Sequence, residues 1–255
     1  MLSSHVPSRL RSLALKATAL AMLGAVSLGG IASGQAFPGL PGDPPAPPGN
    51  DPRSPRPDIV VIVLDDIPPL DGRLWKRLPN IRRNFVQQGQ QFTDAHSETP
   101  ACTPGRASLL TGLHAHHHGA VRTDGTSAFQ PGMTVATALQ DSGYHTVMVG
   151  KYLNLFDRLP DKTPPGWDEM HGFRGDYYDY TMWSNGTPTY HGNAKSDYST
   201  DVIARLARQA IDSAPADQPL FAWIAPYSMH KPWTVAPRHN RSKQCNGLER
   251  WKPLG

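Results

Sequence analysis

The feature that most constrains the fold of this chain is an unbroken apolar run, Ile-Val-Val-Ile-Val-Leu, at residues 59–64. Because the run has no alternating polar positions, it predicts a strand buried on both faces at the centre of a parallel sheet. It ends directly at Asp65 and Asp66. Open α/β sheets bind their ligands at the carboxyl ends of their strands, so we expect these two carboxylates to lie in a functional site.

Helix-like and strand-like patterns alternate along the rest of the chain. Helices are predicted at 78–88, 103–110, 134–141 and 199–213, and strands at 145–149 and 220–225. This alternation is typical of an α/β fold with a mostly parallel sheet.

Residues 164–195 break the alternation, because they are rich in aromatic and turn-forming residues. We expect an inserted loop or hairpin over the site, with its turn at Asn185-Gly186. The sequence from Asn185 to Thr187 also matches an N-glycosylation acceptor, and the hairpin turn is the preferred interpretation.

Residues 1–36 are predicted to be an export signal. Arg9, Arg11 and Lys16 supply positive charge, and a short apolar run rich in Ala and Gly follows at 17–31. An N-terminal membrane anchor is the alternative interpretation. We expect export with cleavage, which would leave a periplasmic, cell-surface or secreted protein with no stable membrane span.

Residues 37–57 are dense in Pro and Gly and are predicted to be an extended linker, so the folded part is expected at 58–240. An apolar content of 38% argues against a protein with several membrane spans. The net charge of +4 comes from Lys and Arg scattered among acidic residues, a pattern that excludes a nucleic-acid-binding surface.

The motif Cys-Thr-Pro-Gly-Arg at 102–106 carries the most specific chemistry. Pro104 suits the first turn of a helix, so Cys102 is predicted at a helix N-terminus, where free N–H groups favour an anion. Arg106 lies one turn further on, and a Cys in this setting is typical of a nucleophile. A buried Cys beside a salt-bridged Arg106 is the alternative. The sequence has one other Cys, Cys245, so a disulfide between the two is a further alternative.

The motif at 102–106, followed by Leu-Thr-Gly, resembles the modification signature of type I sulfatases. Asp65-Asp66 resembles the family's paired calcium ligands, Gly-Lys at 150–151 its Gly-Lys motif, and Ser-Met-His-Lys-Pro-Trp at 228–233 its downstream His motif. The insert and Gly-Lys-Tyr-Leu-Asn look most like N-acetylglucosamine-6-sulfatases. The resemblance implies an alkaline-phosphatase-like α/β sandwich with a mostly parallel central sheet.

The resemblance implies a sulfuric ester hydrolase in which Cys102 is converted to formylglycine (3-oxoalanine) by a formylglycine-generating enzyme or another maturation factor. One hydroxyl of the hydrate would attack sulfur, and the other would then expel sulfate and restore the aldehyde. One Ca²⁺ would be bound by Asp65, Asp66 and the modified residue 102, since calcium prefers oxygen ligands.

The remaining roles follow from the same resemblance. Arg106 would stabilise the hydrate, and Lys151 would pair with a sulfate oxygen. His230 would protonate the leaving oxygen or contact the sulfate. The expected substrate is a sulfated small molecule or glycan, such as a 6-sulfated glucosamine unit or an aryl sulfate.

Several positions depart from the family pattern. Gly105 stands where the family most often has Ser. Leu153 and Asn154 stand where many sulfatases have a His, which leaves the base for sulfate elimination open. The His residues at 114 and 116–118 look like a transition-metal cluster, but the family often has a basic, His-containing turn here, and one of them could face the sulfate.

The C-terminal part of the family's catalytic domain has no counterpart in this sequence. A second Asp-Asn metal pair and a further Lys are not found, and the stretch 241–255 lacks periodicity. We therefore expect an incomplete catalytic domain and an atypical tail, from a truncated, frame-shifted or fragmentary product. Two alternative functions remain: an inactive remnant that binds sulfated sugars, and a phospho- or phosphonoester hydrolase of the same superfamily.

Overall fold

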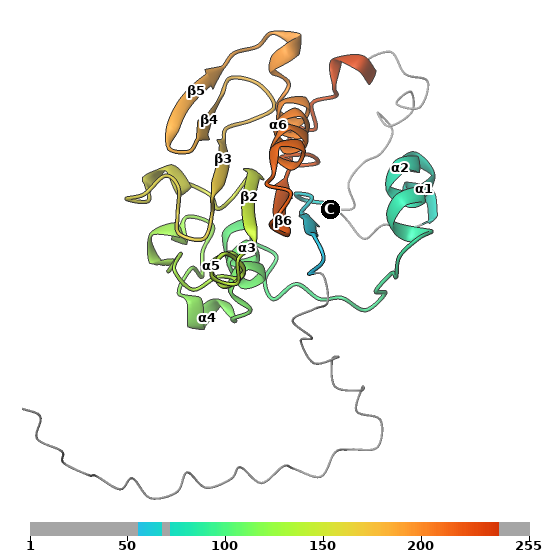
Figure 1. The fold of residues 1–255 in the computed structure, drawn as a ribbon. Coiled ribbons are helices and arrows are strands. Elements are labelled where there is room, and N and C mark those ends of the chain that lie inside the picture. Colours follow the sequence, from blue (N-terminus) through green and yellow to red (C-terminus); the bar gives the residue numbers. More distant parts are fainter. Residues whose placement is uncertain (1–55, 68–71, 240–255) are drawn as a thin grey trace, which may run out of the picture. The chain divides into compact units, whose positions relative to one another are not determined.

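The computed structural model describes residues 56–67 and 72–239, without the side chains of 72–74 (Figure 1). The predicted signal peptide, nearly all of the predicted linker and the predicted tail with Cys245 lie outside these residues. Within the described ranges, every helix is too short or too polar to cross a bilayer.

Six strands form one mixed sheet in the order β1-β6-β2-β3-β4-β5. Their bounds are β1 Ile59–Ile62, β2 His145–Gly150, β3 Glu169–Arg174, β4 Tyr180–Ser184, β5 Thr187–His191 and β6 Leu220–Ala225. The first four strands in the spatial order are mutually parallel, and β4 and β5 continue the sheet antiparallel. The predicted α/β class with a mostly parallel sheet is therefore confirmed.

The position of β1 differs from the prediction. It is parallel to β6, as expected, but it lies at one edge of the described sheet, and β2 and β3 occupy the middle. Val60 and Ile62 are 48% and 44% exposed, so one face of β1 is open. The expectation of a central strand buried on both faces is thus wrong for the described residues, because an apolar run shows what a strand tolerates and not its place in the strand order.

Three predicted helices are confirmed. α3 spans Cys102–Thr111 and ends at Gly112, whose φ of 68° is the left-handed conformation common after helices. α5 spans Val135–Asp141 and is capped by Thr134, whose Oγ1 accepts the Thr137 N–H at 3.2 Å. α6 spans Ser199–Ser213, the range predicted.

The predicted helix at 78–88 is divided into two short pieces. α2 spans Pro79–Ile81 and continues as a single π-helical turn over Arg82–Val86. The structure adds α1 at Gly72–Arg77 and α4 at Ala115–His118, which the periodicity did not predict because both are too short for a recognisable repeat.

The aromatic insert extends the sheet. Its residues supply β3, β4 and β5, and β4 and β5 form a hairpin at Asn185 and Gly186, with φ angles of 45° and 83°. Two positive φ angles at the turn match the tight hairpin turn that favours Asn-Gly. The predicted hairpin is confirmed, but the segment extends the sheet and is not a loop over the site: β3 pairs with β2, and β4 and β5 continue the sheet beyond it (Figure 1).

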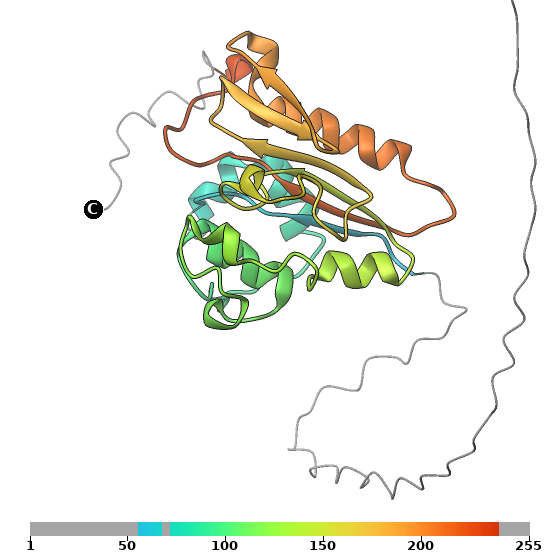
Figure 2. The same ribbon diagram turned by 90° about the vertical axis from the view of Figure 1, so that its left-hand side faces the viewer.

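Helices cover both faces of the sheet, as Figure 2 shows, with α6 on one side and α3 and α5 on the other. The α6 side buries Val147 and Val149 of β2 against Val202 and Ile203. The opposite side forms a second cluster of buried residues, which includes Ala107, Leu110, Ala136, Met148 and Phe221. Packing of these two clusters against the sheet holds the carboxyl ends of β1, β2 and β6 in fixed relative positions.

Candidate active site

The loops after β1 and β6 are joined at Asp65. Its N–H donates to the Ser228 carbonyl at 3.2 Å, and its own carbonyl accepts the Met229 N–H at 2.8 Å. The pairing of the two strands thus continues beyond their ends. It brings His230, which follows directly, next to the first carboxylate of the predicted Asp-Asp pair.

The carboxylate of Asp65 is buried, at 4% exposure, and both of its oxygens bind cations. Oδ1 accepts from Arg106 Nη2 at 3.0 Å, and Oδ2 accepts from Lys151 Nζ at 2.6 Å. Arg106 also donates through Nη1 to the Lys151 carbonyl at 2.6 Å. The loop after β1, helix α3 and the residue after β2 are therefore joined by charge-assisted hydrogen bonds, which are stronger than neutral ones.

These contacts determine the protonation of Asp65. Burial opposes ionisation, but the positive charges and hydrogen bonds of Arg106 and Lys151 outweigh it and hold the pKa of the Asp65 carboxyl below its ordinary value of 3.8. Asp65 is therefore an anion at neutral pH, and the adjacent cations are partly neutralised by it.

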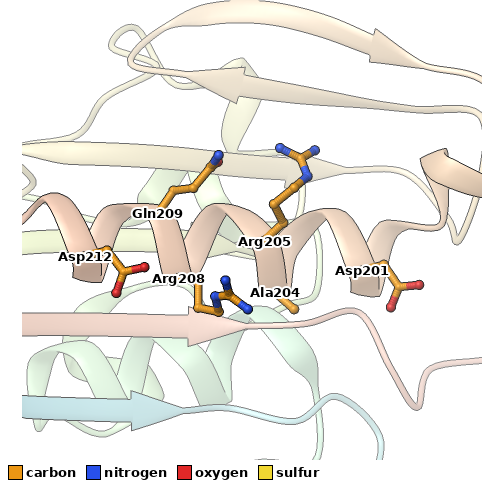
Figure 3. Close-up of a pocket in the computed structure, with 6 residues that line it drawn as sticks. All are labelled: Asp201, Ala204, Arg205, Arg208, Gln209 and Asp212. Atoms are coloured by element: carbon orange, nitrogen blue, oxygen red, sulfur yellow. The ribbon is translucent and has the colours of Figure 1, made fainter.

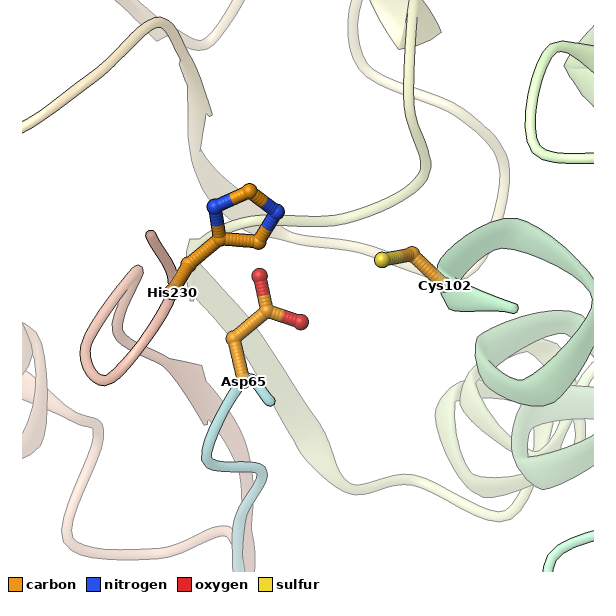
Figure 4. A group of neighbouring side chains, drawn as sticks. All are labelled: Asp65, Cys102 and His230. Carbon is orange, nitrogen blue, oxygen red and sulfur yellow. The ribbon is translucent and has the colours of Figure 1, made fainter. Parts of the chain in front are cut away.

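Cys102 occupies the first turn of α3, as predicted, and is a partly exposed free thiol. Potential ligand atoms of Asp65, Cys102 and His230 all lie within 4.8 Å of one another. Figure 4 shows these three side chains converging from three separate segments of the chain. The alternative of a buried Cys beside a salt-bridged Arg106 is right only in its second half: Arg106 pairs with Asp65, but Cys102 is partly exposed.

His230 has one ring nitrogen engaged by its own loop. Nδ1 lies 2.6 Å from the Lys231 carbonyl oxygen and 2.7 Å from Tyr227 Oη. Nε2 lies 3.5 Å from Asp66 Oδ2. Asp66 itself has a φ of 51° and a half-exposed carboxylate, and it is not part of the group formed by Asp65, Cys102 and His230. All six predicted site residues are therefore at the same end of the sheet.

Tyr227 is a site residue that the sequence patterns did not indicate. Its hydroxyl contacts His230 Nδ1 and donates to the Lys231 carbonyl at 3.1 Å, and its ring lies 5.6 Å from Lys151 Nζ. Burial and nearby acidic groups, Asp176 foremost, raise the pKa of the Tyr227 phenol to about 12. The sequence signal that could have indicated Tyr227 is its position two residues after β6, at the carboxyl end of a parallel strand.

Tyr177 is a second residue that only the structure reveals. Its hydroxyl donates to the His230 carbonyl at 2.7 Å, although the two residues are 53 positions apart. The ring is buried and packs edge-on against Tyr227. The insert therefore reaches the site through this side chain, although its three strands extend the sheet.

The His cluster after α3 does not join the site. His118 is buried, with Nε2 3.1 Å from Ser108 Oγ and Nδ1 accepting the Ala120 N–H. His114, His116 and His117 are exposed and contact one another through their rings. Among the residues that the structure describes, the group of Asp65, Cys102 and His230 is the one with metal-binding spacing.

The departure at Leu153 and Asn154 also has a structural account. Leu153 is buried in the core and offers no proton-transfer group. The Asn154 N–H donates to Thr103 Oγ1 at 3.1 Å, which places this residue beside the first turn of α3. Asn154 Oδ1 is buried and has no hydrogen-bond partner among the described atoms.

The surface hollow along α6 is separate from this cluster. It is lined by side chains of one face of α6, among them acidic and basic ones, namely Asp201, Ala204, Arg205, Arg208, Gln209 and Asp212 (Figure 3). None of the six predicted site residues lines it. Charges of both signs at helical spacing are typical of a solvated helix surface.

A mostly parallel sheet covered by helices on both faces, with a buried cation–carboxylate cluster at the carboxyl ends of its strands, agrees with the expected alkaline-phosphatase-like fold. The family model described as Sulfatase matches residues 57–247, and the chain therefore belongs to the sulfatase family.

Known relatives agree with this assignment. The chain is 31% identical to the N-acetylglucosamine-6-sulfatase of Homo sapiens, over 74% of this chain and 37% of the relative. It is 29% identical to the N-acetylglucosamine-6-O-sulfatase of Bacteroides thetaiotaomicron, over 72% of this chain and 32% of the relative. The chain thus spans about a third of the length of these curated relatives.

A solved structure shares the fold. It is described as a complex with its substrate D-glucosamine-2-N,6-O-disulfate and superposes with a TM-score of 0.60 at 26% identity. The match covers 72% of this chain and 37% of that one.

Proposed function

We propose that this chain carries the nucleophile end of a sulfatase active site, and that the enzyme hydrolyses sulfate monoesters through a formylglycine made from Cys102. The observation that supports this most is the position of Cys102. It stands at the first turn of α3, in its Pro-x-Arg motif, facing Asp65 and His230. As a hydrate, formylglycine supplies a nucleophile that can be regenerated after the ester is cleaved.

Lys151 would bind a sulfate oxygen, and Arg106 would stabilise the formylglycine hydrate. Both are buried cations that contact the same carboxylate, so they are directed to one place at the end of the sheet. A buried ammonium stabilises charge on an oxyanion strongly, since little water competes for it. Lys151 would exchange part of its contact with Asp65 for a sulfate oxygen, while Arg106 stays hydrogen-bonded to the Lys151 carbonyl.

His230 would supply the proton for the departing alcohol. A carbonyl oxygen can only accept a hydrogen bond, so the contact of 2.6 Å with the Lys231 carbonyl requires a proton on Nδ1. Nε2 is then the nitrogen available to the site. In the imidazolium form it carries a proton that can be transferred to the leaving oxygen.

Calcium fits the oxygen ligands here only in part. Asp65 and Asp66 are adjacent in sequence, and Asp65 lies within ligand distance of residue 102, so these positions would hold the ion. When bound, the ion would neutralise sulfate oxygens and polarise sulfur. Both Asp65 oxygens already contact cationic side chains, and calcium takes 6–8 ligands in general, so Asp65, Asp66 and residue 102 do not complete its shell by themselves.

The substrate class we propose is a sulfated sugar, in particular a 6-sulfated glucosamine unit. The names of the two relatives and the ligand of the solved structure support this class. We further propose that the protein is exported and is modified by a formylglycine-generating enzyme. The export signal predicted at residues 1–36 and the sulfatase motif at 102–106 support these two steps.

Coexpression of the chain with a formylglycine-generating enzyme tests the proposal. Mass analysis of the peptide around Cys102 should show sulfur and two hydrogens replaced by one oxygen, together with labelling by an aldehyde-reactive probe. Cys102→Ala is the matched control. An unmodified thiol in a host that converts a reference sulfatase would contradict the proposal.

Turnover is measured separately, with an aryl sulfate and with glucosamine 6-sulfate, each with and without calcium. Activity of the 255-residue chain would exclude the inactive-remnant alternative. Faster cleavage of the matched aryl phosphate would favour the phosphoester alternative. Binding of the sulfated sugar without turnover would favour the remnant.

A further inference from the structure

We propose that Asp65, Cys102 and His230 form a binding site for a thiophilic divalent ion of the zinc type while Cys102 is still a thiol. The ligand atoms of these three residues already lie within 4.8 Å of one another. Small side-chain shifts would bring a carboxylate oxygen, a sulfur and an imidazole nitrogen around one ion.

The ligand types select the ion. Thiolate, imidazole and carboxylate are the groups that bind zinc, whereas calcium takes oxygen ligands. Three protein ligands with one position left for solvent is also the usual composition of an open zinc site. The site is therefore distinct from the calcium site proposed above, although the two share Asp65.

His230 is prepared for this role by its hydrogen bonds. Metal-binding histidines usually donate their second ring N–H to a carbonyl or carboxylate, which fixes the ring and the tautomer. Nδ1 of His230 lies 2.6 Å from the Lys231 carbonyl, so Nε2 keeps its lone pair when the ring is neutral. In Figure 4 one ring nitrogen is on the side of Cys102 and the other is directed away from it.

The charges around the site can accommodate the ion. Asp65 can bind the metal through Oδ2 while Oδ1 keeps its contact with Arg106. Lys151 would then leave Oδ2 and retain the face of the Tyr227 ring, which lies 5.6 Å from Nζ. Thiolate, Asp65 and the nearby Asp66 offset the added positive charge. Binding of the ion releases the thiol proton of Cys102 to solvent.

The consequence concerns the state of the chain before maturation. A bound ion would cover the sulfur of Cys102 and protect it from alkylation or oxidation. Conversion of Cys102 to formylglycine would remove the sulfur ligand and leave only oxygen and imidazole, so the preference for zinc would fall. This last step rests on the proposed function, whereas ion binding by the thiol form does not.

Cobalt spectroscopy tests the site directly. The unmodified chain carrying Cys245→Ser is titrated with Co²⁺, whose bond to a thiolate gives a charge-transfer band in the near ultraviolet. We expect one equivalent to produce the band and Zn²⁺ to abolish it by displacement. Cys102→Ser should remove the band, and His230→Ala should weaken cobalt binding by roughly tenfold or more.

Two controls separate this site from others. The double variant His116→Ala/His117→Ala removes the exposed His cluster and should leave the band unchanged. Far-ultraviolet circular dichroism shows whether each variant is folded. A second measurement needs no substitution at the site: stoichiometric Zn²⁺ should slow iodoacetamide labelling of Cys102 at least tenfold.

Three results would overturn the proposal: no cobalt or zinc binding, binding without the thiolate band, or a band that persists at full strength in His230→Ala. None of these measurements uses turnover. A negative result would therefore leave the sulfatase proposal intact, and absence of sulfatase activity would leave the metal result intact.

Discussion

The ammonium group of Lys151 lies 2.6 Å from Oδ2 of Asp65, although the two residues follow strands that are separated by β6. Arg106 contacts the second oxygen of the same carboxylate from α3. One buried anion thus fixes the relative positions of two cations that come from different elements. The candidate site is organised around this carboxylate, and its contribution can be measured.

Asp65→Asn should destabilise the chain by about 3–5 kcal/mol, because Arg106 and Lys151 would lose their buried counter-charge. The pKa of Asp65 is lower in the folded state, so its stabilisation is complete above the ordinary value of 3.8. It is lost as pH falls from there through the folded-state pKa. Urea unfolding between pH 7 and pH 3 should therefore show a shallower acid dependence in the variant.

Asp124→Asn is the matched control for that experiment. Arg122 also lowers the pKa of Asp124, but this pair is on the surface and is screened by solvent. We expect the pH dependence of the unfolding of Asp124→Asn to equal that of the parent chain within experimental error. Equal pH profiles for Asp65→Asn and the parent chain would show that Asp65 is not the group responsible.

Tyr227→Phe should reduce kcat of the mature enzyme by roughly tenfold with a smaller change in KM, since residues that orient a functional His typically contribute 10–100-fold. The variant keeps the ring beside Lys151 and removes the hydroxyl beside His230 Nδ1. Tyr198→Phe is a suitable comparison, because its hydroxyl donates to the Thr234 carbonyl at 2.8 Å. Equal losses of kcat in both variants would indicate a general packing effect.

Gly105→Ala should stabilise the chain by about 0.5–1 kcal/mol, because Ala is the better residue in a helix interior. A Cβ at this position would lie 3.4 Å from the Thr99 carbonyl oxygen, an ordinary contact. Thermal unfolding measures the effect. A decrease in the melting temperature would show that the loop before α3 cannot accept even one methyl group.

Gly150→Ala is the opposite case and should cost about 2 kcal/mol or more. Gly150 has a φ of 109°, and an added Cβ would lie 2.1 Å from the Ala225 carbonyl oxygen. The clash is with backbone at the junction of β2 and β6, immediately before Lys151. Wild-type stability in this variant would contradict the described register of these two strands.

His118→Ala should destabilise the chain by about 1–3 kcal/mol, because the Ala120 N–H and the Ser108 hydroxyl would lose their buried partner. His116→Ala, on the exposed turn beside it, should change stability by less than about 0.5 kcal/mol. Chemical denaturation of both variants gives the comparison. Equal effects would show that His118 has no special structural role.

Much of the fold followed from the sequence because its signals are local. The amphipathic repeat of α6, the Gly after α3, the cap at Thr134 and the Asn-Gly turn each depend on residues close in the chain. The same holds for the site motifs. Cys102 in its Pro-x-Arg setting, the Asp-Asp pair after β1 and the Gly-Lys after β2 are short patterns whose chemistry can be read directly.

Only the tertiary structure decided how these patterns meet. No local signal shows that β1 lies at the edge of the described sheet, that the aromatic insert continues the sheet, or that Tyr177 reaches the His230 carbonyl. The sharing of Asp65 by Arg106 and Lys151 depends on strand order, a non-local property. The sequence by itself determined the residue types and the family. Packing of the sheet determined their contacts, because hydrogen bonds and charges act through space and not along the chain.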